Sequence, residues 1–105
     1  MRREYDKLVR DRIPEIIASE GRMPDWDEVD SETALKYLEK KLGEECAEYC
    51  ESREAAELAD VIEVVRGILH HRGMTWDELE RIRADKYKKR GGFEGGILLK
   101  AVDGD

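Results

Sequence analysis

Apolar residues recur at intervals of three and four along most of the chain, which is the spacing of amphipathic helices. The clearest stripe begins after residue 32 and consists of Leu35, Leu38, Leu42, Cys46 and Tyr49. Residues 54–72 are more apolar, and their hydrophobic arc spans more than half of the helical wheel. A helix with so wide an arc needs neighbours on two sides, so we expect a second copy of the chain to complete a bundle.

The two apolar helices are expected to form an antiparallel hairpin. Asp30 or Ser31 can cap the first helix, and Gly73 can stop the second. Neither Gly nor Pro lies near residues 51–53, where the chain would have to turn, and Ser52 as the N-cap of the second helix is the local signal. A turn at this place would bring the inner halves of the two helices face to face.

A short helix and a connecting segment precede the hairpin. Pro14 suits the first turn of a helix that ends near Gly21. Residues 22–30 suit a connecting loop or a short edge strand, with Trp26 folding back over the core.

A further helix follows the hairpin. Thr75 and Glu78 form the pattern of a capping box, so the helix should begin near residue 76 and run to about Arg90. Residues 97–102 are predicted to form a short strand. The pattern as a whole predicts an all-α fold, a compact helical bundle in which flanking helices and this C-terminal strand surround the hairpin, completed by dimerisation.

Composition and charge narrow the classes of function. A chain of 105 residues suits one domain, so we expect residues 1–105 to form a single domain. The net charge of −7 disfavours broad binding to nucleic acid. No apolar run approaches the roughly 20 residues needed to cross a bilayer, and the N-terminus lacks the apolar core of a signal peptide. We therefore expect a cytoplasmic protein with neither nucleic acid nor membrane as a partner.

The two cysteines allow two interpretations. Cys46 and Cys50 lie four residues apart in one predicted helix, which is neither a disulfide framework nor the spacing of a zinc ribbon. We interpret them as reduced thiols in the core. The less favoured alternative joins them to His70 and His71 in a zinc site.

Two acidic pairs are the main candidates for chemistry. Glu45 and Glu48 lie three residues apart, as do Glu57 and Asp60, so each pair can share one helix face. In an unbroken helix Glu45 and Glu57 would be about 18 Å apart along the axis, whereas the predicted hairpin lets all four carboxylates converge. Such a group suits Mg²⁺ or Mn²⁺. In a chain with 26 acidic residues the pairs can also be a solvated face, but Glu57 lies among apolar positions, which favours a site.

These motifs resemble a known family. The stretch Lys41-Leu42-Gly43-Glu44-Glu45-Cys46-Ala47-Glu48, followed by Glu57-Leu58-Ala59-Asp60, is similar to the ExxE and ExxD signature of the all-alpha nucleoside triphosphate pyrophosphohydrolases. This MazG-like superfamily includes phosphoribosyl-ATP pyrophosphohydrolase. Residues 7–14 and 90–96 resemble the ends of a compact branch of predicted house-cleaning pyrophosphatases. Only eight residues separate Glu48 from Glu57, fewer than in many relatives, which implies a tight hairpin and a less elaborate substrate pocket.

The resemblance implies Mg²⁺-dependent hydrolysis between the α and β phosphates of a nucleotide, which yields a monophosphate and pyrophosphate. The implied metal ligands are Glu45, Glu48, Glu57 and Asp60. The catalytic candidates are Glu45, Glu44 and Lys41. Glu44 would assist a second metal or orient the water, unless it is only a surface residue. Lys41 would contact a phosphate, unless it only pairs with Glu45. The alternatives are phosphoribosyl-ATP pyrophosphohydrolase and, in another class, a noncatalytic helical interaction module.

Cations are also expected at such a site, because phosphoryl transfer depends on positioning and charge neutralisation. Two groups of cations are candidates for binding the substrate, at the two ends of the chain: Lys7, Arg10 and Arg12, and Arg83, Lys86 and Arg90. Surface salt bridges would also explain the first group, and cations near a helix C-terminus favour the helix dipole whatever the function.

Overall fold

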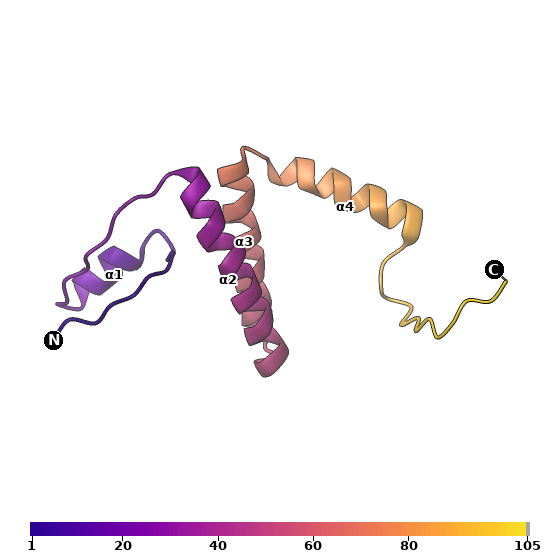
Figure 1. Cartoon of the computed structure of the whole chain (residues 1–105), viewed down its shortest axis with the longest axis horizontal. Coiled ribbons are helices and arrows are strands. Elements are labelled where there is room, and N and C mark those ends of the chain that lie inside the picture. Colours follow the sequence, from indigo (N-terminus) through magenta and orange to yellow (C-terminus); the bar gives the residue numbers. More distant parts are fainter. Residues whose placement is uncertain (105) are drawn as a thin grey trace. The chain divides into compact units, whose positions relative to one another are not determined.

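The computed structural model describes residues 1–104, and these residues contain helices but no strand. In chain order the helices are α1 (Ile13–Ser19), α2 (Ser31–Ser52), α3 (Ala55–Arg72) and α4 (Trp76–Arg90) (Figure 1). The all-α prediction is therefore confirmed. The chain divides into two units, Met1–Met74 and Thr75–Asp105, which are described separately below. The single domain expected over residues 1–105 stays a prediction, as does dimerisation.

Helices α2 and α3 form the predicted antiparallel hairpin and lie side by side (Figure 1). Asp30 caps α2, because its Oδ1 accepts a hydrogen bond of 2.9 Å from the backbone N–H of Thr33. Arg53 ends α2 in the left-handed conformation, with φ 60°, a region that residues with a Cβ seldom adopt. The N-cap of α3 is Glu54 rather than Ser52, whose hydroxyl instead accepts a hydrogen bond of 3.2 Å from the Glu54 N–H.

The apolar core of the hairpin is small. It consists of Ala34 and Leu38 from α2 with Val64 and Leu69 from α3. Gly67 lets the helices approach closely, because a Cβ at this position would lie 3.3 Å from both terminal carbons of Leu38. The helix contact therefore depends on a small residue facing a large one.

The buried face of α2 overlaps the predicted stripe and extends beyond it. Leu38 is buried and Leu35, Leu42 and Tyr49 are half-buried, as predicted, whereas Cys46 is exposed. A second row of residues, Ala34, Leu38, Lys41 and Glu45, is also buried or half-buried. This set follows the i, i+4, i+7, i+11 spacing of a single helix face. Both cysteines are free, in agreement with the prediction of reduced thiols, but both are exposed, so their predicted place in the core was wrong. Position 46 lies about 100° around the helix from position 45 and points off the seam.

The segment before α2 lies along the surface of the first unit. The Tyr37 hydroxyl donates a hydrogen bond of 2.8 Å to Asp6, which ties the N-terminal segment to α2. Pro14 lies in the first turn of α1, as predicted. Residues 22–30 form a loop, which confirms that alternative, but Trp26 is 58% exposed and does not cover the core.

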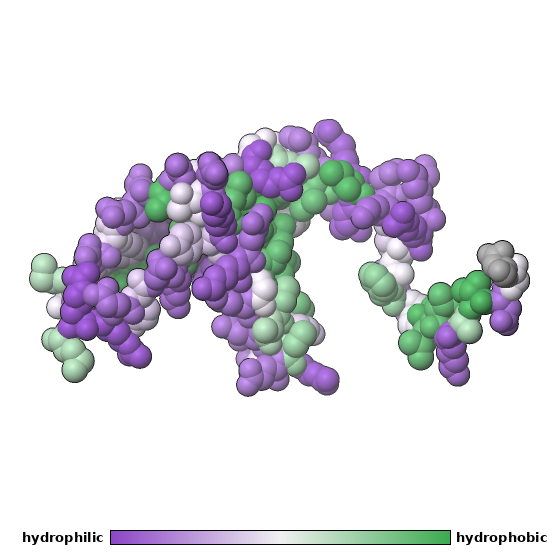
Figure 2. Space-filling model, viewed as in Figure 1, coloured by the Kyte–Doolittle hydropathy of each residue, from purple (hydrophilic) through white to green (hydrophobic). Residues whose placement is uncertain are grey.

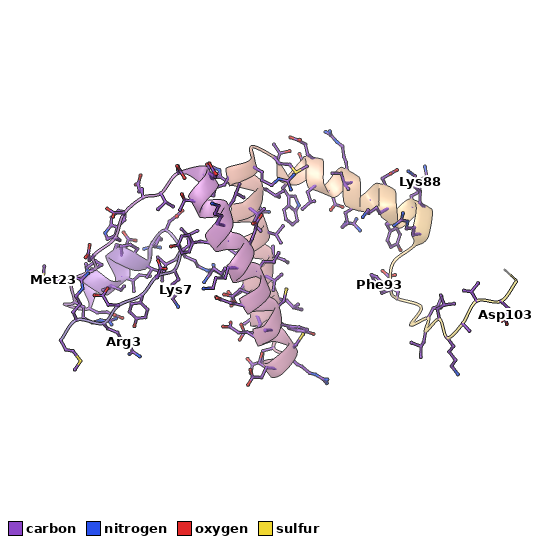
Figure 3. The ribbon with its side chains drawn as sticks, in the orientation of Figure 1. Arg3, Lys7, Met23, Lys88, Phe93 and Asp103 are labelled. Atoms are coloured by element: carbon purple, nitrogen blue, oxygen red, sulfur yellow. The ribbon has the colours of Figure 1, made fainter. Side chains whose placement is uncertain are left out.

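The second unit consists of α4 and the C-terminal segment. The capping box is present, because Thr75 Oγ1 accepts a hydrogen bond of 3.1 Å from the Glu78 N–H and the Glu78 carboxylate bonds back to Thr75. The predicted strand at residues 97–102 is absent from the described chain, because a strand needs a partner for its backbone and none lies beside it. Its apolar side chains are exposed and form a green group in Figure 2, and Phe93 projects beyond the end of α4 in Figure 3.

Among the described residues, no helix combines the length and apolarity that crossing a membrane requires.

Candidate metal centre

Three carboxylates converge where α2 and α3 pack together near the turn. One carboxylate oxygen each from Glu45, Glu57 and Asp60 lies within 4.8 Å of the other two. Glu45 comes from α2 and the other two come from the first turns of α3. The turn at residues 53–54 therefore brings together side chains that an unbroken helix would hold about 18 Å apart.

Each carboxylate is placed by its helix. Glu45 lies on the face of α2 that packs against α3 and is 9% exposed, which makes it the one buried charged residue in the described chain. The Lys41 ammonium, one turn earlier, lies 3.5 Å from Glu45 Oε1. Glu57 lies in the first turn of α3, where the positive end of the helix dipole favours an anion, and both Glu57 and Asp60 are half-buried.

Glu48 joins this group at its exposed edge. Its pKa is raised, first by a hydrogen bond that its protonated form makes with Glu45, then by the negative charges of Glu45 and Glu57. The pKa of Glu57 is also raised, first by partial burial and then by the neighbouring charges of Asp60 and Glu45. The negative charges of neighbouring carboxylates add to both shifts, and a cation among these side chains would offset those charges.

Of the cations predicted to bind the substrate, Arg10 pairs with one of these carboxylates. Its Nη2 lies 2.7 Å from Asp60 Oδ1 in a salt bridge that crosses from the N-terminal segment to α3. Arg12 does not join them, because its guanidinium pairs with Glu15 on α1 at 2.5 Å. Lys7 lies on the same segment and lines a neighbouring cavity with Lys41.

Glu44 and Lys41 occupy different positions beside the centre. The exposed Glu44 lines the cavity and does not belong to the converging carboxylates. Lys41 both pairs with Glu45 and lines the cavity, so it lies between the two. Whether Glu44 orients a water or assists a second metal stays a prediction.

The C-terminal group of cations belongs to the second unit. Arg83 pairs with Glu80 on α4, with Nη2 2.6 Å from the carboxylate. Lys86 and Arg90 border an open furrow along the same helix. Their role in binding a substrate stays a prediction.

A zinc site built from cysteine and histidine is incompatible with the hairpin. His71 Nδ1 lies 2.9 Å from the Ser31 hydroxyl, which places the histidines beside the first residue of α2. Cys46 and Cys50 lie near the other end of α2, and Cys50 is about 28 Å from Ser31 along the helix axis. Among the described residues, the carboxylates are the group with the geometry of a metal site.

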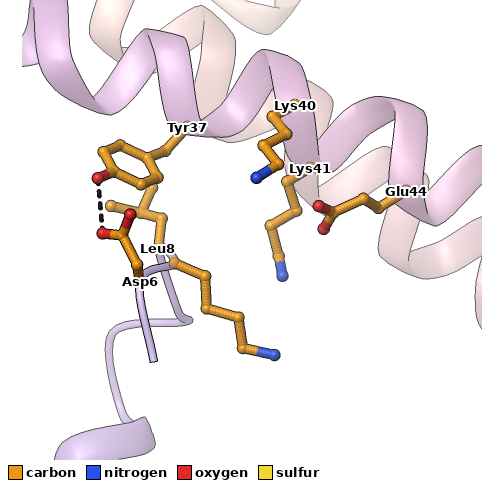
Figure 4. Close-up of a pocket in the computed structure, with 7 residues that line it drawn as sticks. Asp6, Leu8, Tyr37, Lys40, Lys41 and Glu44 are labelled. Atoms are coloured by element: carbon orange, nitrogen blue, oxygen red, sulfur yellow. Dashed lines mark hydrogen bonds between the residues drawn. The ribbon is translucent and has the colours of Figure 1, made fainter. Parts of the chain in front are cut away.

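Three residues beside the centre were not singled out by the sequence. Asp6, Tyr37 and Lys40 line the cavity that Lys7 and Lys41 share (Figure 4). The adjacent Lys40 and Lys41 were the available signal for Lys40. Their positions differ by about 100° around α2, so only one of the two can face α3 and the other must point to a different side of the helix. The contact of Tyr37 with Asp6 spans 31 positions of sequence and has no local signal.

The chain was compared with known protein families, curated proteins and solved structures. None of these comparisons found a match. The resemblance to the all-alpha pyrophosphohydrolases therefore stands on the motifs of this chain, and membership of that family stays a prediction.

Proposed function

We propose that this chain is a Mg²⁺-dependent nucleotide pyrophosphohydrolase. It would hydrolyse a nucleoside triphosphate, canonical or modified, between the α and β phosphates to give a monophosphate and pyrophosphate. The observation that carries this proposal is the convergence of Glu45, Glu57 and Asp60 within 4.8 Å of one another. With Glu48, whose pKa is raised by the neighbouring Glu45, they are the four positions of the ExxE and ExxD motifs.

The carboxylates suit the proposed ion. They offer only oxygen ligands, which Mg²⁺ and Mn²⁺ prefer, and they come from two packed helices. A hydrogen bond with Glu45 and partial burial are the first causes of the raised pKa values of Glu48 and Glu57, respectively, and the negative charges of neighbouring carboxylates add to both; a divalent cation would offset those charges. When bound, the ion would neutralise phosphate charge and activate a water.

The remaining residues of the site would bind and orient the substrate. Arg10 holds Asp60 in place and lies where it can approach a phosphate beside the centre. Lys41 neutralises part of the charge on Glu45 and extends the positive surface toward the N-terminal segment. Both cations would stabilise negative charge on the phosphates as the bond breaks.

The test is pyrophosphate release from a panel of canonical, deaminated and oxidised nucleotides, with phosphoribosyl-ATP included. We expect release from at least one of them in millimolar Mg²⁺, loss of release in excess chelator, and loss in Glu57→Gln. The matched control is Glu63→Gln, an exposed glutamate on α3 outside the centre, which should retain activity. If no nucleotide releases pyrophosphate, the enzyme proposal fails and the noncatalytic helical module replaces it.

A second copy of the chain is part of the proposal. Only four apolar side chains are buried in the described residues, while Leu58 and Ile62 on α3 are 45% and 50% exposed. So small a core in a chain of 105 residues supports a homodimer or higher homo-oligomer that covers the second side of α3. Light scattering after size-exclusion chromatography should give at least twice the 12.2 kDa chain mass, and Ile62→Asp should reduce it. A cytoplasmic location is proposed with it, where reduced cysteines and nucleotides occur together.

A further inference from the structure

Residues 93–102 form an apolar segment, the C-terminal arm, that no other part of the described chain covers. Phe93, Ile97 and Leu99 are 98%, 91% and 74% exposed. Residues 97–102 contain neither helix, strand nor turn. A single exposed apolar side chain is ordinary, but a run of them on one segment is typical of a surface that binds another protein.

The arm has an apolar side and a mixed side. In an extended segment, alternate side chains point to opposite sides, so Ile97 and Leu99 share one side while Leu98 and Lys100 share the other. The second side includes an ammonium group, which solvent must reach. The side of Ile97 and Leu99 is therefore the one suited to docking.

Helix α3 carries an apolar row of matching length, here called the α3 row. Its members Leu58, Ile62 and Val65 follow the i, i+4, i+7 spacing of one helix face, and the first two are 45% and 50% exposed. Ile62 lies about 160° around α3 from Val64, which is buried in the hairpin core, so the row faces away from α2. The row is about 10 Å long, and residues 97–101 of an extended arm span about 13 Å. One arm is therefore long enough to cover it.

The charges of the two surfaces are complementary. Residues 86–90 of α4, which come shortly before the arm, contain four cations and no acid. The unit Met1–Met74, to which the α3 row belongs, carries the whole of the net charge of −7. Opposite charges of this kind steer the arm of one copy toward the hairpin of another.

A symmetric exchange of arms between two copies would bury the area that a stable dimer needs. Phe93, Ile97 and Leu99 would together lose about 300 to 500 Å² of accessible surface. Two arms against two α3 rows would bury about 1,200 to 2,000 Å² in total, which is the size of a specific and stable interface. Residues 73–75 alone connect α3 to α4, and short hinges favour the exchange of a segment between copies.

We propose that the C-terminal arm of one copy packs on the α3 row of a second copy, and that each copy of the dimer contributes one arm. The assignment rests on the homodimer in the proposed function and adds to it the segment that covers the second side of α3. The row begins at Leu58, between Glu57 and Asp60 in the sequence. The arm of the partner subunit therefore stabilises the helix turns that hold these two carboxylates.

Light scattering after size-exclusion chromatography of the full chain, over a dilution series, measures the dissociation constant of the dimer. Leu99→Asp should raise that constant at least about 100-fold, because each dimer contains the contact twice. Leu98→Asp is the matched control, since it places the same charge one residue earlier, on the other side of the arm, and should change the constant less than about threefold. Both side chains are exposed within one chain, so neither replacement should unfold it.

The outcomes separate the arm contact from the dimer itself. A dimer that both variants leave intact, or weaken equally, would overturn the arm contact and leave the proposed homodimer standing. A wild type that is monomeric at every concentration would overturn both. Neither result depends on the hydrolysis of a nucleotide, so the enzyme proposal stands or fails separately.

Cross-linking shows which copy receives the arm. In a chain without the native thiols, Cys46→Ser with Cys50→Ser, molecules carrying Leu99→Cys are mixed with molecules carrying Ile62→Cys and oxidised. The proposal predicts a disulfide-linked pair of chains, which Leu98→Cys in place of Leu99→Cys should not give. A disulfide that forms only when both substitutions are in the same chain would show that the arm folds onto its own α3 and would overturn the exchange.

Discussion

Replacing Glu57 by glutamine should raise the stability of the metal-free protein and lower its response to Mg²⁺. The pKa of Glu57 is raised in the folded chain by partial burial and by the charges of Asp60 and Glu45. Its charged form is therefore less favourable in the folded protein than in the unfolded chain at neutral pH. Glutamine has nearly the same shape and no charge, so the metal-free variant should melt at a higher temperature than wild type.

The response to the ion should have the opposite order. Mg²⁺ at 100 times its dissociation constant stabilises a folded protein by about 2.7 kcal/mol. For a unit of the size of Met1–Met74 this is a rise in melting temperature of roughly 10 to 20 °C. If Glu57→Gln weakens the ion about tenfold, the same concentration gives about 1.4 kcal/mol, or roughly half the rise.

Thermal melts followed by circular dichroism, with chelator and with a series of Mg²⁺ concentrations, measure both effects. Glu63→Gln removes an equal charge from the exposed side of α3 and should follow wild type in both conditions. A metal-free Glu57→Gln that melts below wild type would show that this carboxylate stabilises the fold by its contacts. Equal Mg²⁺ responses in wild type and Glu57→Gln would refute the proposal that Glu57 is a ligand.

Three further predictions concern the same hairpin. The pKa of Glu48 is raised in the folded chain from 4.5, so metal-free wild type should lose stability relative to Glu48→Gln as the pH rises above 4.5. Below that pH the two proteins should have the same stability. Urea unfolding at several pH values measures the difference, and a difference that does not change with pH would contradict the prediction. Leu38→Ala should cost about 2 to 5 kcal/mol in the same assay, because the side chain is 7% exposed, while Leu98→Ala, 81% exposed, should cost less than about 0.5 kcal/mol. Arg10→Ala should change stability by less than about 1 kcal/mol but tighten Mg²⁺ binding in calorimetry and raise the KM for nucleotide, since a fixed positive charge leaves the centre. Arg12→Ala, whose partner lies on α1, should do neither, and equal effects of the two variants would show that only net charge matters.

Local signals in the sequence were sufficient for the helices and for the N-caps of α2 and α4. The Asp30 cap and the Thr75 capping box act through backbone groups within three residues, so their patterns are readable without knowledge of the fold. The turn itself was placed correctly near residue 52. Its conformation was not, since it depends on Arg53 at φ 60°, a position where glycine would have been the usual signal.

The face of α2 that packs against α3 was harder to predict from the sequence. Hydrophobicity placed Leu35, Leu38, Leu42 and Tyr49 correctly on the buried side of α2, but it added Cys46 and left out Ala34 and Glu45. Ala34 is small and Glu45 is charged, so hydrophobicity does not indicate that either residue is buried. Ala34 nevertheless permits close packing of the helices, and Glu45 belongs to the carboxylate centre. Of the four acidic positions, Glu45, Glu57 and Asp60 converge, because their motif spacing depends only on the helix period and the turn. Lys40 lines a cavity with the distant N-terminal segment, a contact that has no local signal in the sequence.

The four buried apolar side chains are distributed unevenly along the hairpin. All of them lie in the half away from the turn, and among the described residues Glu45 is the one buried residue in the half beside the turn, where Leu42, Tyr49 and Val61 are only half-buried. A segment without an apolar core opens more readily than the rest of a protein, so backbone amides near the turn should exchange with solvent sooner than those around Leu38. In the proposed enzyme, a bound ion would stabilise the half of the hairpin beside the turn, which lacks a buried apolar core. Slower amide exchange near the turn would then indicate that the ion is bound and that the protein can accept its substrate.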